Sequence, residues 1–275
     1  MFGLGQDVLS NVIATIFIAI AGWLLSIILR LPFVYGKRRR LFSFFNISQE
    51  QSNLTAYLST VFVLNGGSVD FRGIARTFSA PAIPSAELSA IEPISRLFTD
   101  ANLDSLPRAI RSWLGDKVHW SFQNIKPVFM ASPQDRNQIA QGNIITVGSQ
   151  FYNSIADHFL ETYDPILRMV QIGQRMVIRV NKGQRSGDVF EQRQGQADDL
   201  AIVEKLYDEP NNRAVFFAAG LGVVGTIGAV NYIVNNWSKL EKDFKATPFA
   251  ICLRFQNVLN DPHAYKKPIE LSWFR

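Results

Sequence analysis

Ala214-Val-Phe-Phe-Ala-Ala-Gly-Leu-Gly-Val-Val-Gly-Thr226 is the stretch that decides the fold. Its first five residues are uniformly apolar, as in a buried strand, and its three glycines have the spacing G-x-G-x-x-G. The residues after Gly225 place one apolar stripe on a helix: Ile227, Val230, Ile233, Val234, Trp237 and Leu240. A buried strand that turns through glycines into an amphipathic helix is the repeating unit of Rossmann-like sheets.

Short apolar strands alternate with amphipathic helices along much of the remaining chain. The other predicted strands are 54–64, 143–147, 200–203 and 248–255. One predicted helix begins at Ser85, and another follows Gly148 with Phe151, Ile155 and Phe159 on one face. This alternation predicts an α/β fold with an open, Rossmann-like and mostly parallel sheet, covered by helices on both faces.

Other segments carry weaker patterns. We expect an irregular loop over 66–84, a short helix over 106–114, strands at 118–122 and 127–130, and a hairpin or small insertion within 167–193. The sequence shows no internal repeats.

The N-terminal region contains an uncharged stretch from Val8 to Leu29. Roughly 22 residues at a rise of about 1.5 Å cover a hydrocarbon core of about 30 Å, so the stretch predicts one transmembrane helix. The alternatives are a cleaved signal peptide and a buried helix of a soluble core. Basic residues, Arg30 and the run Lys37–Arg40, follow this stretch and none precedes it.

This charge asymmetry predicts that the N-terminus lies outside and the rest of the chain in the cytoplasm. We therefore expect a single-pass protein of the inner membrane, with the lipid bilayer as a partner. Its expected parts are an anchor over 1–36, a basic linker over 37–52 that can also touch anionic lipids, and a cytoplasmic α/β domain over 53–275.

Composition narrows the function classes. The net charge is +5, and four of the basic residues belong to the run 37–40, so we expect no nucleic-acid partner. Cys252 is the one cysteine, which rules out an internal disulfide and agrees with a reducing compartment. No zinc, P-loop or hydrolase motif occurs. We accordingly expect neither a metal site nor a cofactor.

Two glycine turns are the candidate ligand sites, because ligands of such sheets bind where strands pass into helices. In the first, Gly148 allows a sharp turn, Ser149 can cap the helix or bond a ligand oxygen, and Asn153 can reach the same space. The alternative is an ordinary glycine turn with a serine cap.

The second candidate turn contains Gly220, Gly222, Gly225 and Thr226, and its helix N-terminus is compatible with a phosphate or another anion. It departs from the dinucleotide pattern because it lies late in the chain and no acidic residue closes the next strand. Asp199 precedes a neighbouring strand and can orient a ribose or base; the alternative is a solvated aspartate.

Taken together, the order of these motifs resembles a Rossmann-like module of uncharacterised bacterial proteins, which are often joined to DNA-binding or membrane segments. The resemblance covers roughly residues 53–257 and has Gly148-Ser149 where such modules can show two glycines. It implies a sensory or regulatory module. We therefore expect a membrane-anchored regulatory protein that binds a small ligand such as a nucleotide, and that forms homo-oligomers or joins a membrane complex. The alternatives are a nucleotide- or glycoside-cleaving enzyme and a structural subunit of a membrane complex.

Overall fold

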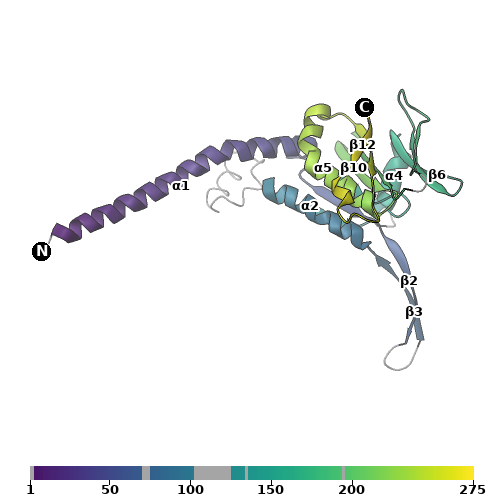
Figure 1. Cartoon of the computed structure of the whole chain (residues 1–275), viewed down its shortest axis with the longest axis horizontal. Helices are drawn as coiled ribbons and strands as arrows, with labels where there is room; N and C mark the ends of the chain where they lie inside the picture. The colour runs from purple at the N-terminus through teal and green to yellow at the C-terminus, as the bar shows by residue number, and fades with distance from the viewer. Residues whose placement is uncertain (1–2, 70–74, 102–124, 134–135, 194–195) are drawn as a thin grey trace. The chain divides into compact units, whose positions relative to one another are not determined.

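The structure is a computed structural model, and it describes residues 3–69, 75–101, 125–133, 136–193 and 196–275. The chain divides into two compact units, residues 1–40 with 101–124 and residues 41–100 with 125–275. The second unit carries the α/β fold (Figure 1). The helix and strand predicted over 106–114 and 118–122 lie outside the described residues.

A seven-stranded mixed sheet forms the centre of the α/β unit. Its strands, in spatial order, are β12 (Ile269–Phe274), β11 (Phe249–Phe255), β9 (Asp199–Asp208), β10 (Arg213–Gly220), β5 (Asn143–Val147), β1 (Leu54–Leu58) and β4 (Val128–Ala131). β10, β5, β1 and β4 run parallel to one another, whereas β9, β11 and β12 are joined by antiparallel pairing. The prediction of an α/β fold is confirmed.

The prediction of a mostly parallel sheet is wrong, because only half of the neighbouring strand pairs are parallel. β9 and β10 are connected by a tight turn that contains the short 3-10 helix Glu209–Asn211 and Asn212 in the left-handed region (φ 49°). So short a connection permits only antiparallel pairing. Uniformly apolar strands indicate burial on both faces but do not indicate strand direction. The sequence pattern therefore could not predict the antiparallel half of the sheet.

One face of the sheet is covered by α2 (Ser85–Ala101), by α5 (Val223–Phe244) and by the last residues of α1 (Gly3–Phe44). Aromatic rings join these elements to the strands. The ring centroids of Phe44 and Phe45 lie 5.1 and 5.0 Å from that of Phe216 on β10, and Phe244 stacks on Phe249 at 4.5 Å. Burial of such large rings is a main source of stability for this layer.

The opposite face packs against α4 (Ser154–Thr162) and against a three-stranded antiparallel sheet. That small sheet consists of β6 (Leu167–Ile172), β7 (Arg175–Val180) and β8 (Val189–Phe190). It confirms the predicted hairpin or insertion within 167–193. Leu167, Ile178 and Val180 of this sheet are buried against Ile202 of β9 and Cys252 of β11.

Between β1 and α2 the chain forms a hairpin where the sequence analysis predicted one long strand and an irregular loop. Strand β1 ends at Leu58, and β2 (Val61–Val69) pairs with β3 (Ala75–Ala82) as a separate two-stranded sheet (Figure 1). Helix α2 begins at Ser85, as predicted, and buries Ala90, Ile94, Leu97 and Phe98.

The N-terminal stretch is helical, but the predicted transmembrane anchor is wrong. Within the described residues, no helix combines the length and the apolar character that crossing a bilayer requires. Helix α1 continues past Pro32 into the basic run and ends at Phe44.

Candidate functional site

The second glycine turn is filled by a carboxylate from the same chain. Asp199, at the start of β9, accepts the backbone N–H of Gly222 at 2.9 Å and that of Gly225 at 2.6 Å, besides that of Leu200 at 2.8 Å. Its side chain therefore occupies the N-terminus of α5, where an external anion would otherwise bind. Burial raises the pKa of Asp199, and the three N–H bonds oppose that rise.

Packing explains the remaining motif residues of this turn. A Cβ on Gly225 would lie 2.7 Å from the carbonyl oxygen of Leu200, so a glycine lets α5 approach β9 closely. Thr226 accepts the N–H of Gly220 at 3.1 Å and donates to the carbonyl of Gly222 at 3.0 Å. The G-x-G-x-x-G spacing thus serves a strand–turn–helix unit that is capped from within.

Asn153 is fully buried and ties the first glycine turn together. Its amide Nδ2 donates to the carbonyls of Tyr57 on β1 and Val147 on β5, both at 3.0 Å. Its Oδ1 accepts the N–H groups of Ile155 and Ala156, which makes Asn153 the N-cap of α4. Ser132 Oγ also donates to Oδ1, at 2.6 Å.

Ser149, which the sequence analysis considered as the cap of this helix, precedes the cap by one turn. Its carbonyl accepts the N–H groups of Tyr152 at 3.1 Å and Asn153 at 3.0 Å. Asn153 therefore bonds to two strands and a helix rather than pointing to an open space.

Beside Gly148 lies a buried carboxyl group that the sequence analysis missed. Glu87, in the first turn of α2, accepts the backbone N–H of Ser59 at 2.5 Å. Gly148 has φ +96°, and a Cβ there would overlap both Ser59 Oγ and the Glu87 carboxyl. Burial raises the pKa of Glu87, against the lowering effect of its bonds to Ser59.

Ser59 and Gly148 follow the carboxyl ends of β1 and β5, which are adjacent in the sheet. The chain leaves β1 toward β4 on one side and leaves β5 toward β10 on the other. Such a switch point is where open α/β sheets usually bind ligands. Here it carries a carboxyl group, which disfavours an anion at the Gly148 turn.

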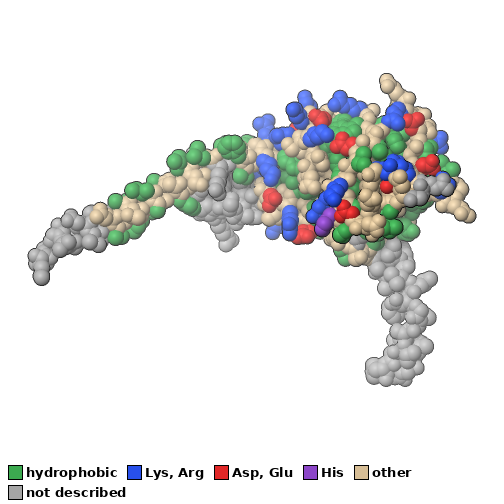
Figure 2. Space-filling model, in the orientation of Figure 1, with side chains coloured by type: hydrophobic (Ala, Val, Ile, Leu, Met, Phe, Trp, Pro, Cys, Tyr) green, Lys and Arg blue, Asp and Glu red, His purple; other side chains and the backbone are tan. Residues whose placement is uncertain are grey.

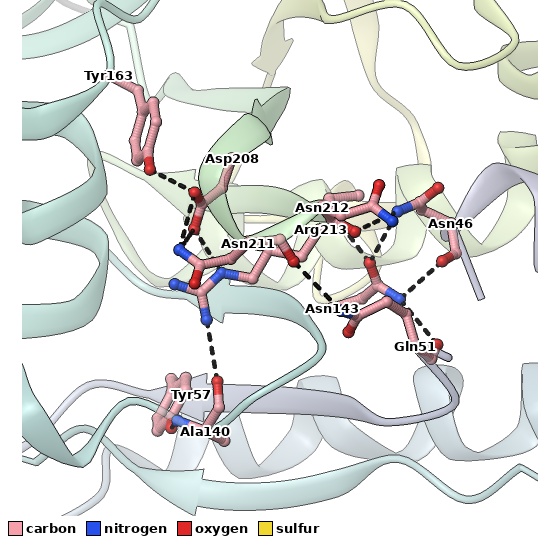
Figure 3. Close-up of polar contacts among 11 residues, drawn as sticks. Asn46, Gln51, Tyr57, Ala140, Asn143, Tyr163, Asp208, Asn211, Asn212 and Arg213 are labelled. Carbon is pink, nitrogen blue, oxygen red and sulfur yellow. Dashed lines mark hydrogen bonds and ion pairs between the residues drawn. The ribbon is translucent and has the colours of Figure 1, made fainter. Parts of the chain in front are cut away.

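The amino-terminal edge of the parallel strands carries a second polar cluster (Figure 3). Asp208 accepts hydrogen bonds from Tyr163, Asn211 and Arg213, the last at 2.6 Å. Burial alone would raise the pKa of Asp208, but these bonds together lower it. Arg213 also donates to the carbonyl of Ala140, so the cluster joins β10 to the segment before β5.

Asn143 extends this joint, as Figure 3 shows. It donates to the carbonyls of Asn46 at 2.9 Å and Gln51 at 3.3 Å, and it accepts the N–H of Ala214 at 2.9 Å. The cluster therefore holds β5, β10 and the segment before β1 in register by bonds within the chain, and we assign it a structural role.

Two neighbouring residues of β9 place ionisable groups in the core, on opposite faces of the sheet. Glu204 is fully buried and accepts the N–H groups of Ile166 at 2.6 Å and Leu167 at 3.1 Å. Burial raises its pKa from 4.5 to about 8. Lys205 donates to the carbonyls of Phe44 and Lys245, and burial lowers its pKa to about 8.

A cavity of about 800 Å³ opens beside the end of α5. We call it the Phe244 cavity. Its lining combines apolar side chains with three cationic residues and one carboxylate: Ile166, Lys182, Gly183, Leu206, Asp243, Phe244, Lys245, Thr247, Pro248 and Arg275. A volume of this size suits a small organic ligand.

The cationic groups of the cavity come from separate parts of the chain. Lys182 follows β7 and pairs with Asp164 at 3.5 Å, whereas Lys245 is the C-cap of α5. Arg275 donates to the carbonyl of Asp243 at 2.7 Å, and its guanidinium lies 5.1 Å from the centroid of the Phe244 ring. Only the tertiary structure brings these three residues to one cavity.

No protein-family model, curated protein or solved structure matches the chain. The resemblance to a Rossmann-like module therefore stays a prediction. Within the described part of the chain, no group of three or more His, Cys, Asp and Glu side chains is placed to hold a metal ion. Figure 2 shows basic and acidic side chains interspersed on the visible face of the α/β unit.

The structure thus brings the eight predicted site residues into two separate turns at the carboxyl ends of the parallel strands. They are Gly148, Ser149, Asn153, Asp199, Gly220, Gly222, Gly225 and Thr226. The side chains of Asn153, Asp199 and Thr226 bond within the chain, as does the carbonyl of Ser149. No sequence motif signals Glu87, Lys182, Lys245 or Arg275, because these residues are brought to their sites only by folding.

Proposed function

We propose that the α/β unit is a regulatory module that binds a small molecule in the Phe244 cavity. The observation that carries this proposal is the combination of about 800 Å³ of space, an apolar lining and cationic groups from distant segments. The glycine turns are weaker candidates because Asp199 and Glu87 already fill them. A nucleotide, the ligand expected from the sequence, fits the cavity by size and charge.

A regulatory role follows from the elements that the cavity joins. Ile166, Lys182 and Gly183 belong to the small sheet and its connections, whereas Asp243–Pro248 form the end of α5 and the turn into β11. A ligand that contacts both sides would stabilise their mutual packing and thereby raise the stability of the unit. Occupancy could be transmitted in this way to the elements that α5 contacts.

The test begins with the purified full chain, which is denatured so that released small molecules can be identified by mass spectrometry. Melting temperatures with a panel of nucleotides provide the second measurement. Pro248→Trp fills part of the cavity and should abolish both the copurified molecule and the melting shift, whereas Pro210→Trp, at an exposed proline outside the lining, should retain them. An empty chain without any melting shift would instead favour the structural-subunit alternative.

Glu87 supports a second candidate function, the nucleotide- or glycoside-cleaving enzyme. A buried carboxyl group with a raised pKa at a switch point has the properties of a general acid. Turnover of nucleotides and aryl glycosides by the purified chain tests this alternative, with Glu87→Gln as the variant that should lose activity. Absence of turnover with all of these compounds would leave the binding module as the better account.

Self-association, expected from the sequence, also stays a prediction. Figure 2 shows apolar side chains along α1. The large ones that are exposed include Val12, Ile13, Ile16, Phe17, Ile18, Trp23 and Phe33. Exposed apolar surface of this extent favours association between copies. We expect light scattering to show oligomers of the full chain and a smaller species for the double variant Phe17→Ser, Ile18→Ser. A monomeric parent chain would contradict the prediction.

A further inference from the structure

We propose that the ligand of the Phe244 cavity is an amphipathic anion, an apolar group that carries a carboxylate or a phosphate. This inference rests on the proposed function, since it names the chemical class that the same cavity selects. It follows from how the apolar and cationic parts of the lining are arranged.

One part of the cavity lining is apolar and suits an apolar group of the ligand. Ile166, Leu206, Phe244 and Pro248 contribute apolar surface to the lining. The Phe244 ring packs against two other rings, since its centroid lies 4.5 Å from that of Phe249 and 5.3 Å from that of Trp273. Because the ring is already packed in place, little conformational entropy is lost when a ligand binds against it. Covering the apolar surface of the ligand then makes the free energy of binding more favourable.

The polar part of the cavity favours a negative charge. Lys182, Lys245 and Arg275 are opposed by one lining carboxylate, Asp243, and by Asp164, which pairs with Lys182 at 3.5 Å. Counted over side chains alone, the lining and Asp164 together therefore carry an excess of one positive charge. A cationic ligand would meet net repulsion, and a neutral ligand would gain no ion pair.

Arg275 is the residue best placed to bind the anionic group of the ligand. Its bond to the Asp243 carbonyl uses one of the five N–H groups of a guanidinium, and the group lies 5.1 Å from the centroid of the Phe244 ring. A planar guanidinium held in place can form two parallel hydrogen bonds to a carboxylate or phosphate. Lys182 and Lys245 add further positive charge to the lining.

The experiment compares each anionic probe with a neutral partner that has the same apolar part. Isothermal titration of the full chain would use AMP against adenosine and indole-3-acetate against indole-3-acetamide. We expect each anion to bind at least about tenfold more tightly than its neutral partner, equivalent to about 1.4 kcal/mol. Arg275→Gln and Lys182→Gln should each remove most of that preference, and added salt should weaken it.

Lys267→Gln is the matched control, because Lys267 is exposed, pairs with Asp261 and lies outside the lining. It should bind every probe like the parent. If the neutral probes bind as tightly as the anions, or if both cavity variants retain the preference, the inference is overturned while the binding module stands. If no probe binds, and no copurified molecule or melting shift is found, both proposals fail.

Discussion

The Asp199 carboxylate accepts the N–H of Gly225 at 2.6 Å, across 26 positions of the sequence. Asp199 begins β9, and Gly225 lies in the first turn of α5, so a strand supplies the cap of a helix that follows a different strand. The negative charge meets the positive end of the helix dipole and satisfies N–H groups that lack partners within the helix. This contact turns an apparent anion site into a structural joint.

Replacement of this carboxylate should destabilise the protein. Asp199→Asn keeps the size of the side chain but loses the charge and turns amide N–H groups toward the N–H donors of Gly222 and Gly225. We expect the free energy of unfolding to fall by about 2 kcal/mol, as measured by urea denaturation. Asp243→Asn, at an exposed position of α5, should change it by less than about 0.5 kcal/mol. Equal effects of the two variants would contradict the capping role.

Gly148→Ala should destabilise the folded protein for two reasons: Gly148 has a positive φ, and a Cβ there would overlap the carboxyl group of Glu87. Gly173→Ala separates them, because Gly173 has φ +62° and no heavy atom lies within 4 Å of the point that a Cβ would occupy. We expect the free energy of unfolding, measured by urea denaturation, to fall by about 1 kcal/mol for Gly173→Ala and by about 3 kcal/mol or more for Gly148→Ala.

A double-mutant cycle tests whether Glu87 causes the difference. The combined Gly148→Ala, Glu87→Ala variant should be at least about 1 kcal/mol more stable than the sum of the two single effects predicts. Strict additivity would show that the carboxyl of Glu87 does not limit the space at Gly148.

Loss of the Asn153 amide should separate β1, β5 and α4. Asn153→Ala removes two bonds donated to strand carbonyls and three that Oδ1 accepts. We expect a loss of about 3 kcal/mol, because buried partners are left unsatisfied. Thermal denaturation would measure it, with Asn235→Ala on the exposed side of α5 as the control. A loss below about 1 kcal/mol would show that water replaces these bonds.

Glu204 should make stability fall as pH rises. Its pKa is 4.5 ordinarily and about 8 in the folded chain, so between these values the folded state holds a proton that the unfolded state has released. Stability is then greatest below about pH 4.5 for this group and declines until about pH 8, with a slope of at most about 1.4 kcal/mol per pH unit. Denaturant titrations across this range should show a flatter profile for Glu204→Gln. An unchanged profile would mean that Glu204 titrates normally.

The local elements of the fold could be predicted from the sequence to a large extent. Apolar periodicity located β5, β10, β11 and α5, because each buries a continuous face within a few residues. Apolar periodicity could not predict strand direction, since a strand buried on both faces has the same composition in either direction. The pairing of β9 with β10 was decided by the turn at Glu209–Asn212, and the apolar N-terminal stretch gave no measure of where its helix ends.

By itself, the sequence determined the α/β character of the chain and the two glycine turns, because both depend on short-range chemistry. Only the tertiary structure decided which groups those turns face. Asp199 and Glu87 reach Gly225 and Gly148 through pairing and packing of segments distant in sequence. For the same reason, Lys182, Lys245 and Arg275 form one cavity only after the small sheet, α5 and the last strand have packed together.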